Sequence, residues 1–209
     1  RECVATIVKD VVKIFSVRKL NDKLFLSGSA DNTVKVWDFK ELKCLKTFDE
    51  HTCTVFSLCV MTERIFVSGS KDTTIKVWDI DRDYSLKTLE GQNNCVYRLC
   101  KVNDELFVSG SFDNTLKIWS VEQDQGLIGT LNGHTDRLYD VCLLTTNIVA
   151  STSDDKTIRI WNLTNNTCIE TIKMDSTPFT LTTIRNNTFA SGDYTGKVSF
   201  FRFQTNNIN

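Results

Sequence analysis

Two groups of residues in this 209-residue chain have side chains that could carry out acyl transfer. Each group holds a histidine, a serine and an aspartate at the same offsets: His51, Ser68 and Asp72, then His134, Ser151 and Asp155. In serine hydrolases a histidine takes the proton of the serine and a carboxylate orients the histidine. Because the same offsets recur along the chain, we interpret both groups as structural and not as catalytic sites.

Other sequence patterns of catalysis or metal binding are absent. The sequence has no G-x-S-x-G and no H-E-x-x-H, and residues 192–197 (GDYTGK) are too short for a phosphate loop. His51 and His134 are the only histidines and no C-x-x-C pair occurs, so we expect no zinc site. We therefore expect no enzyme activity, no metal and no cofactor.

A phrase of twelve residues occurs five times along the chain. It reads SGSADNTVKVWD at 27–38, SGSKDTTIKVWD at 68–79, SGSFDNTLKIWS at 109–120, STSDDKTIRIWN at 151–162 and, in altered form, SGDYTGKVSFFR at 191–202. The aromatic residues Trp37, Trp78, Trp119, Trp161 and Phe201 follow one another at steps of 41, 41, 42 and 40 residues. This period predicts repeats that stack and bury a shared core.

Each repeat is expected to hold four short strands. In the second repeat, residues 55–60 and 64–69 are rich in apolar and β-branched side chains, and residues 75–78 alternate apolar with polar ones. Residues 85–89 give the fourth strand. With a single proline and no long helical period, the chain is predicted to be all-β, with four-stranded antiparallel sheets in a closed or radial array.

These motifs resemble the WD-repeat β-propeller family over nearly the whole chain. The resemblance implies a hydrogen-bonded tetrad inside each blade, complete in two repeats: His51, Ser68, Asp72 and Trp78, and His134, Ser151, Asp155 and Trp161. The first and third repeats place Asp10 and Gln92 at the histidine position. For the fifth repeat we expect Asp175, Ser191, Thr195 and Phe201 at the tetrad positions.

Residues 3–7 match the fourth strand of the other repeats, and the fifth repeat lacks that strand. We therefore expect residues 3–7 to pair with the strand around 197–203 and close a ring of five blades, with residues 1–209 as one propeller domain. Propellers of this family most often carry seven blades, so the alternative is that two blades are missing, which would allow self-association. Since the chain starts at Arg1, we expect it to be part of a longer polypeptide.

Positions that vary between repeats point to a binding surface at one mouth of the channel. Naming the four strands of each repeat a to d in chain order, we expect strand a to bring Phe15, Phe56, Tyr97, Tyr139 and Thr180 to this mouth and the b–c turns to add Phe112 and Tyr194. Lys13, Lys71 and Arg137 should lie among them, with Pro178 at the position of Lys13 and Arg137 in the fifth repeat. The resemblance implies that this top face recognises partners. The alternative is that the aromatic rings only pack between blades.

On the channel wall we expect Arg98 and Asp140 to approach each other.

Composition narrows the class of partner. The net charge of −1 gives no basic surface for nucleic acid or an anionic membrane, and no apolar run approaches the length of a membrane span. Six of the eight cysteines recur at equivalent repeat positions and are expected to be buried thiols, which suits a cytoplasmic or nuclear protein.

Together these features predict a non-catalytic protein-interaction scaffold or substrate receptor that binds a peptide or protein. The repeat style is similar to that of propellers in F-box/WD-repeat ubiquitin-ligase receptors and of WD-repeat domains linked to kinases or RING proteins. The alternative is a targeting or regulatory domain of a larger kinase or ubiquitin-ligase chain. A chromatin or nucleic-acid binder and an enzyme are disfavoured by the charge and by the missing catalytic motifs.

Overall fold

The computed structural model describes residue 6, residues 12–185 and residues 187–203. Within these residues consecutive strands pair antiparallel in five sheets, which we number as blades in chain order. Blade 1 contains β1 (Ile14–Lys19), β2 (Leu24–Ser29), β3 (Val34–Asp38) and β4 (Lys43–Phe48). Blade 2 contains β5 (Val55–Val60), β6 (Ile65–Ser70), β7 (Ile75–Asp79) and β8 (Ser85–Leu89). The prediction of four strands in the second repeat is confirmed.

Blades 3 and 4 repeat this order, and blade 5 has three described strands. Blade 3 contains β9 (Val96–Lys101), β10 (Leu106–Ser111), β11 (Leu116–Ser120) and β12 (Leu127–Leu131). Blade 4 contains β13 (Leu138–Thr145), β14 (Ile148–Ser153), β15 (Thr157–Asn162) and β16 (Thr167–Lys173). Blade 5 contains β17 (Pro178–Arg185), β18 (Thr188–Asp193) and β19 (Val198–Arg202).

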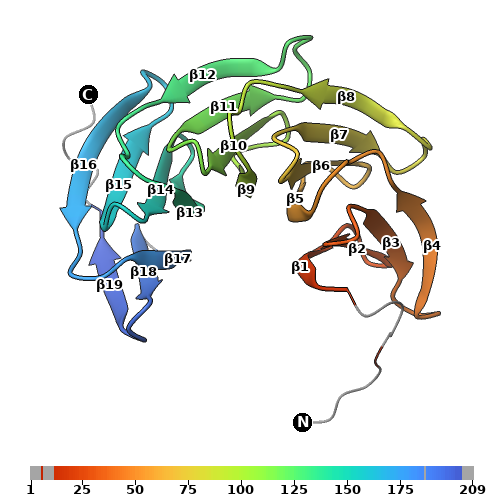
Figure 1. The fold of residues 1–209 in the computed structure, drawn as a ribbon, viewed down its shortest axis with the longest axis horizontal. Coiled ribbons are helices and arrows are strands. Elements are labelled where there is room, and N and C mark those ends of the chain that lie inside the picture. Colours follow the sequence, from red (N-terminus) through yellow and green to blue (C-terminus); the bar gives the residue numbers. More distant parts are fainter. Residues whose placement is uncertain (1–5, 7–11, 186, 204–209) are drawn as a thin grey trace.

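The blades stand side by side around a common centre, with β1, β5, β9, β13 and β17 innermost (Figure 1). Each inner strand contacts the inner strand of the next blade, from β1 to β17. The described strands form an arc that is open between blade 5 and blade 1 (Figure 1). The expected closing strand includes residues 3–5 and 7, which lie outside the described residues, so ring closure stays a prediction.

Apolar side chains between neighbouring blades form the core. Val34, Val36 and Phe48 of blade 1 pack with Phe66 and Trp78 of blade 2 in one buried cluster. The same arrangement recurs between the following blades, and Trp78 and Trp161 are 0% and 1% exposed. Both tryptophans therefore lie between neighbouring blades.

Hydrogen bonds along the channel also join neighbouring blades. Ser16 Oγ accepts the backbone N–H of Leu58 in blade 2 at 3.2 Å, and Ser57 Oγ accepts that of Leu99 in blade 3 at 3.0 Å. These serines occupy equivalent positions, and each fixes its own blade, blade 1 or blade 2, against the next.

The end of blade 5 exposes apolar side chains that other blades bury. Val198 and Phe200 on β19 are 60% and 70% exposed, whereas the equivalent Val34 and Val36 are 0% and 1% exposed under blade 2. Among the described strands, β19 pairs only with β18. We call Ile184, Val198 and Phe200 the blade-5 face.

The opposite end of the arc shows the complementary feature. Ile14 and Val17 of β1 are 51% and 53% exposed, whereas the equivalent Val55 and Leu58 of β5 are both 0% exposed. Both open ends of the arc thus present the side chains that elsewhere form contacts between blades.

None of the described residues belongs to a helix that could cross a membrane.

Candidate functional site

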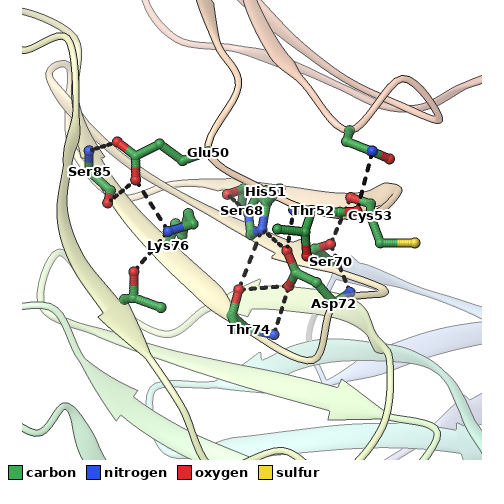
Figure 2. Close-up of polar contacts among 12 residues, drawn as sticks. Glu50, His51, Thr52, Cys53, Ser68, Ser70, Asp72, Thr74, Lys76 and Ser85 are labelled. Atoms are coloured by element: carbon green, nitrogen blue, oxygen red, sulfur yellow. Dashed lines mark hydrogen bonds and ion pairs between the residues drawn. The ribbon is translucent and has the colours of Figure 1, made fainter.

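A buried hydrogen-bond network in blade 2 contains the first histidine group (Figure 2). His51 Nδ1 lies 2.7 Å from Asp72 Oδ2, and His51 Nε2 lies 2.7 Å from Ser68 Oγ. The indole N–H of Trp78 donates to the same Ser68 oxygen at 2.8 Å. The hydroxyl of Ser68 can then donate its own hydrogen to a neutral imidazole, so every polar group of the tetrad is paired.

The distances match those of a hydrolytic triad, but the surroundings do not. Ser68 is 0% exposed and His51 is 4% exposed, so no substrate can reach the serine oxygen. That oxygen also accepts the indole hydrogen bond of Trp78. The group therefore connects the strands of blade 2, as expected from its recurrence.

Blade 4 repeats this tetrad. His134 lies 2.7 Å from Asp155 and 2.7 Å from Ser151, and Trp161 donates to Ser151 at 2.8 Å. Burial lowers the pKa of His134 even though Asp155 opposes the shift. Burial alone would raise the pKa of Asp155, but hydrogen bonds from His134 and a neighbouring threonine outweigh it and lower that pKa. The network thus favours a neutral imidazole and an ionised carboxylate.

Blades 1 and 3 keep part of the tetrad. Both keep the tryptophan–serine hydrogen bond at 2.8 Å. In blade 3, Gln92 replaces the histidine and donates from Nε2 to Ser109 Oγ at 2.6 Å. In blade 1, Lys35 pairs with Asp31, and the expected Asp10 lies outside the described residues.

The strand register corrects the alignment of the fifth repeat by one residue. Pro178 pairs with Asp193 just as Val55 pairs with Ser70 in blade 2. Phe179 therefore occupies the position expected for Thr180, and Thr177 the position expected for Pro178. The last step between repeats is one residue shorter than most, and the shortening lies ahead of β17, because Phe179 precedes Phe201 by 22 residues just as Phe56 precedes Trp78.

The same shift removes Asp175 from the histidine position. Met174 takes that position and packs against the core between the last two blades. The side chain of Asp175 is fully exposed, 4.0 Å from Lys197. Ser191 Oγ is buried with no hydrogen-bond partner among the described residues, because the side chain of Phe201 lacks the N–H that tryptophan donates in the other blades. Blade 5 therefore has no tetrad.

The segment that resembles a phosphate loop is a turn between β18 and β19. Asp193 Oδ1 accepts the backbone N–H groups of Thr195 and Lys197 at 2.9 and 3.0 Å. A carboxylate thus occupies the backbone amides that a phosphate would need, so this segment does not have the arrangement of a phosphate loop.

Seven aromatic rings form one continuous series of contacts over the five blades. We call them the aromatic surface: Phe15, Phe56, Tyr97, Phe112, Tyr139, Phe179 and Tyr194. Centroids of contacting rings lie between 4.8 and 6.2 Å apart, within the range of favourable aromatic pairs. The six rings expected at the channel mouth lie in this series, and Phe179 was missed because of the shifted alignment.

One backbone hydrogen bond in each blade positions these side chains. The donor is the backbone N–H of the residue just before the aspartate of the b–c turn, or before the residue equivalent to that aspartate. The acceptor is the backbone carbonyl of the residue two positions before the aromatic residue of strand a. The N–H to carbonyl pairs are Ala30–Lys13, Lys71–Thr54, Phe112–Cys95, Asp154–Arg137 and Tyr194–Thr177. Turn and strand residues of every blade are therefore held on the same face.

The aromatic surface is partly packed and partly open. Tyr194, Phe15 and Phe179 are 63%, 44% and 37% exposed. The other four rings are half-buried, and none of the seven belongs to the cores between blades. The rings thus pack against one another while part of their area faces solvent.

Polar contacts hold the rings around blade 4. Tyr139 Oη donates to Asp154 at 2.9 Å, and Thr177 Oγ1 donates to the other oxygen of Asp154 at 3.2 Å. Burial, together with Asp154, raises the pKa of Tyr139, so the phenol stays protonated. The guanidinium of Arg137 lies 5.5 Å from the ring centroid of Phe112, a cation–π distance.

Three exposed cations border the aromatic surface. Lys13, Lys71 and Arg137 form no ion pair with any carboxylate of the described residues. Their charges are available to a ligand on this face.

The expected approach of Arg98 and Asp140 on the channel wall is confirmed. Arg98 Nε donates to Asp140 Oδ1 at 2.7 Å. Within the described part of the chain, no group of three or more histidine, cysteine or carboxylate side chains could hold a metal ion.

Comparison with protein-family models matches the "WD domain, G-beta repeat" model at residues 2–38, 42–79, 83–120 and 125–162. A search of curated proteins finds no match. Among solved structures, the WD40 β-propeller domain of Doa1 is similar with a TM-score of 0.85 and 26% identity, covering 98% of this chain and 69% of that chain.

Two further structures have the same fold. The computationally designed Ika8 protein matches with a TM-score of 0.82 and 28% identity, over 91% of this chain and 58% of that chain. U3-55K matches with a TM-score of 0.85 over 93% of this chain and 62% of that chain, and at 18% identity it shows the fold alone. The chain thus spans from 58% to 69% of the length of these three structures.

Proposed function

The chain belongs to the WD40-repeat family, whose propeller domains generally mediate protein–protein interaction, and we propose that it is a non-catalytic domain that binds a peptide or protein on its aromatic surface. The observation that carries this proposal is the continuous series of seven rings on one face. Aromatic side chains have few rotatable bonds and supply much of the binding energy at interfaces. Rings that already support one another lose little further entropy when a partner docks.

The charges around the rings favour a partner with acidic groups. Lys13, Lys71 and Arg137 are exposed without a carboxylate partner in the described residues, whereas both oxygens of Asp154 already accept hydrogen bonds. A carboxylate or phosphate on the partner would find unpaired cations at the edge of an apolar contact area. We therefore propose a segment that combines apolar anchors with acidic side chains.

The role as a substrate receptor or adaptor, in a ubiquitin-ligase or kinase context, is supported by the style of the repeats alone. We also propose a cytoplasmic or nuclear location. The seven cysteines of the described residues are free thiols, and burial raises the pKa of Cys59 and Cys100 to about 12. Such thiols are unreactive and suit a reducing compartment.

For the fifth blade we propose that residues 3–7 add the missing fourth strand to β19. Among the described strands β19 pairs only with β18, and open strand edges of this kind recruit strands. By analogy with Lys35, which pairs with Thr47 in blade 1, Ser199 would pair with Thr6. The partner strand would come from the same molecule if the ring closes and from a second molecule if it stays open.

Binding partners captured from a cell extract test the proposed surface. Tyr97→Ala, Tyr194→Ala and Arg137→Glu should each reduce capture of the partner, with a loss of about 1–3 kcal/mol for each aromatic residue. Tyr84→Ala is the matched control, because Tyr84 is 57% exposed outside the aromatic surface. Unchanged melting temperatures must accompany the losses. Full capture by all three variants would place recognition elsewhere.

A further inference from the structure

A cavity of about 350 Å³ lies in the central channel and is bordered by inner strands of all five blades. Leu58, Leu99, Val141 and Leu181 border it, and their side chains are buried between neighbouring blades. Because inner strands of five blades surround this cavity, a charge inside it interacts more strongly than a charge on an open surface.

Two guanidinium groups enter this cavity from positions where the other repeats have small side chains. Arg18 takes the place of Cys59, Cys100 and Cys142, and Arg98 takes the place of Ser57. At each of these two positions only one repeat has an arginine. Both arginines place a cation at the same cavity, and the stacking of the repeats does not require a cation there.

One carboxylate, Asp140, borders the cavity, and its hydrogen-bonding capacity is used. Its Oδ1 accepts from Arg98 Nε at 2.7 Å and from Val141 N at 2.9 Å. Its Oδ2 accepts from Thr180 Oγ1 at 3.0 Å and from Leu181 N at 2.8 Å. A carboxylate accepts about four such bonds, so Asp140 balances Arg98 and has no place for Arg18.

Arg18 therefore carries the unbalanced charge. It is half-buried, its Nη1 donates to its neighbour's carbonyl, Val17 O, at 2.9 Å, and none of the described carboxylates forms an ion pair with it. Burial and the charge of Arg98 lower the pKa of Arg18. The other two cations at the cavity, Lys19 and Lys101, already pair with the exposed Asp22 and Asp104.

We propose that the channel cavity binds a small oxyanion of the phosphate class, held by Arg18 together with the guanidinium edge of Arg98 that Asp140 leaves free. The planar fork of a guanidinium matches the oxygens of a phosphate, and two such groups bind it better than a chloride ion. Lys19 and Lys101 precede the a–b turns, so the site lies toward the end of the channel opposite the aromatic surface. It is independent of the proposed protein partner.

Calorimetric titration of the purified chain with inorganic phosphate, at constant ionic strength maintained with sodium chloride, tests this site. We expect saturable binding with one phosphate per chain, and binding about tenfold weaker in Arg18→Gln. Arg202→Gln is the control, because Arg202 is exposed on β19 and does not border the cavity. It should bind phosphate like the wild type.

Arg18→Lys separates the effect of charge from that of geometry, because lysine keeps the positive charge but lacks the planar guanidinium. We expect its affinity for phosphate to lie between those of the wild type and Arg18→Gln. The melting temperature of each variant without phosphate shows whether it folds, and phosphate should raise the melting temperature of the wild type and of Arg202→Gln. Absence of saturable binding by the wild type, or equal affinity of the wild type and Arg18→Gln, would overturn the proposal.

Discussion

At the scale of single residues, each b–c turn contains one residue with positive φ. These residues are Asn32, Thr73, Asn114, Lys156 and Gly196, with φ between 60° and 85°. Glycine and asparagine tolerate this region, whereas a β-branched side chain is strained in it. Blade 2 therefore carries a local cost that blades 1, 3 and 5 avoid.

Thr73→Asn should raise the free energy of unfolding by about 0.5–1 kcal/mol by removing this strain. The reverse change in blade 3, Asn114→Thr, should lower it by a similar amount. Urea unfolding of both variants gives the comparison. A loss of stability in Thr73→Asn would mean that the threonine side chain makes a contribution larger than the strain.

The tetrad of blade 4 gives the protein a pH-dependent stability. Because burial lowers the pKa of His134 in the folded chain, the unfolded state binds more protons once the pH falls below about 6.5. The stabilising contribution is complete above that value and is lost as the pH falls toward the folded pKa. Asp155, with a lowered pKa, loses its contribution only in strong acid, below the ordinary pKa of an aspartate.

His134→Gln, which copies Gln92 of blade 3, should therefore be less stable than the wild type at pH 7.5, with a smaller difference at pH 5.5. Chemical unfolding at the two pH values measures both differences. A difference that does not change with pH would show that His134 does not titrate between the folded and unfolded states.

At the scale of strands and blades, sequence reasoning succeeds where the repeat signature is strong. Trp37, Trp78, Trp119 and Trp161 mark the third strand of four blades, and from them the register of the other strands follows. In the fifth repeat, which has Phe201 instead of tryptophan, the expected positions Thr180, Pro178 and Asp175 lie one residue beyond the equivalent Phe179, Thr177 and Met174. Counting back from Phe201 by the 22 residues that separate Phe56 from Trp78 gives Phe179, so the sequence held the information that the expected alignment did not use.

The open blade-5 face makes a direct prediction about equivalent residues. Phe200 is 70% exposed, and its equivalent in blade 4, Ile160, is 1% exposed. Ile160→Asn should cost about 3–5 kcal/mol because it leaves a cavity and buries an amide, while Phe200→Asn should cost less than about 1 kcal/mol. Urea unfolding at low protein concentration compares them. Equal losses would show that another surface covers Phe200 in solution.

At the scale of the whole molecule, the arc exposes complementary faces at its two ends. The blade-5 face and the Ile14–Val17 side of β1 are apolar, and the edge of β19 is unpaired in the described residues. Surfaces of this kind associate in water. The sequence indicated both possible outcomes, closure and self-association, because the number of blades in a ring depends on packing angles that a repeat pattern does not encode.

When the arc is open, its two apolar ends can associate between molecules. The weight-average mass measured by light scattering should then rise with protein concentration. Phe200→Asn should reduce this rise, since it replaces the largest apolar side chain of the blade-5 face by a polar one. A constant monomer mass at all concentrations would contradict association between molecules and favour pairing of residues 3–7 with β19 inside one molecule.

The central claim is that a protein partner docks on the aromatic surface and not on the opposite face of the propeller. A photoreactive phenylalanine analogue placed at position 194 or, as a control, at position 63 probes the two faces separately. Tyr194 is 63% exposed on the aromatic surface, and Glu63 is exposed on an a–b turn at the other face.

Irradiation of cells that express each variant, followed by mass spectrometry of the adducts, compares the two positions directly. We expect a specific protein adduct from position 194 that disappears when Tyr97→Ala is added, and none from position 63. Adducts from position 63 alone, or adducts from position 194 that persist with Tyr97→Ala, would contradict the account.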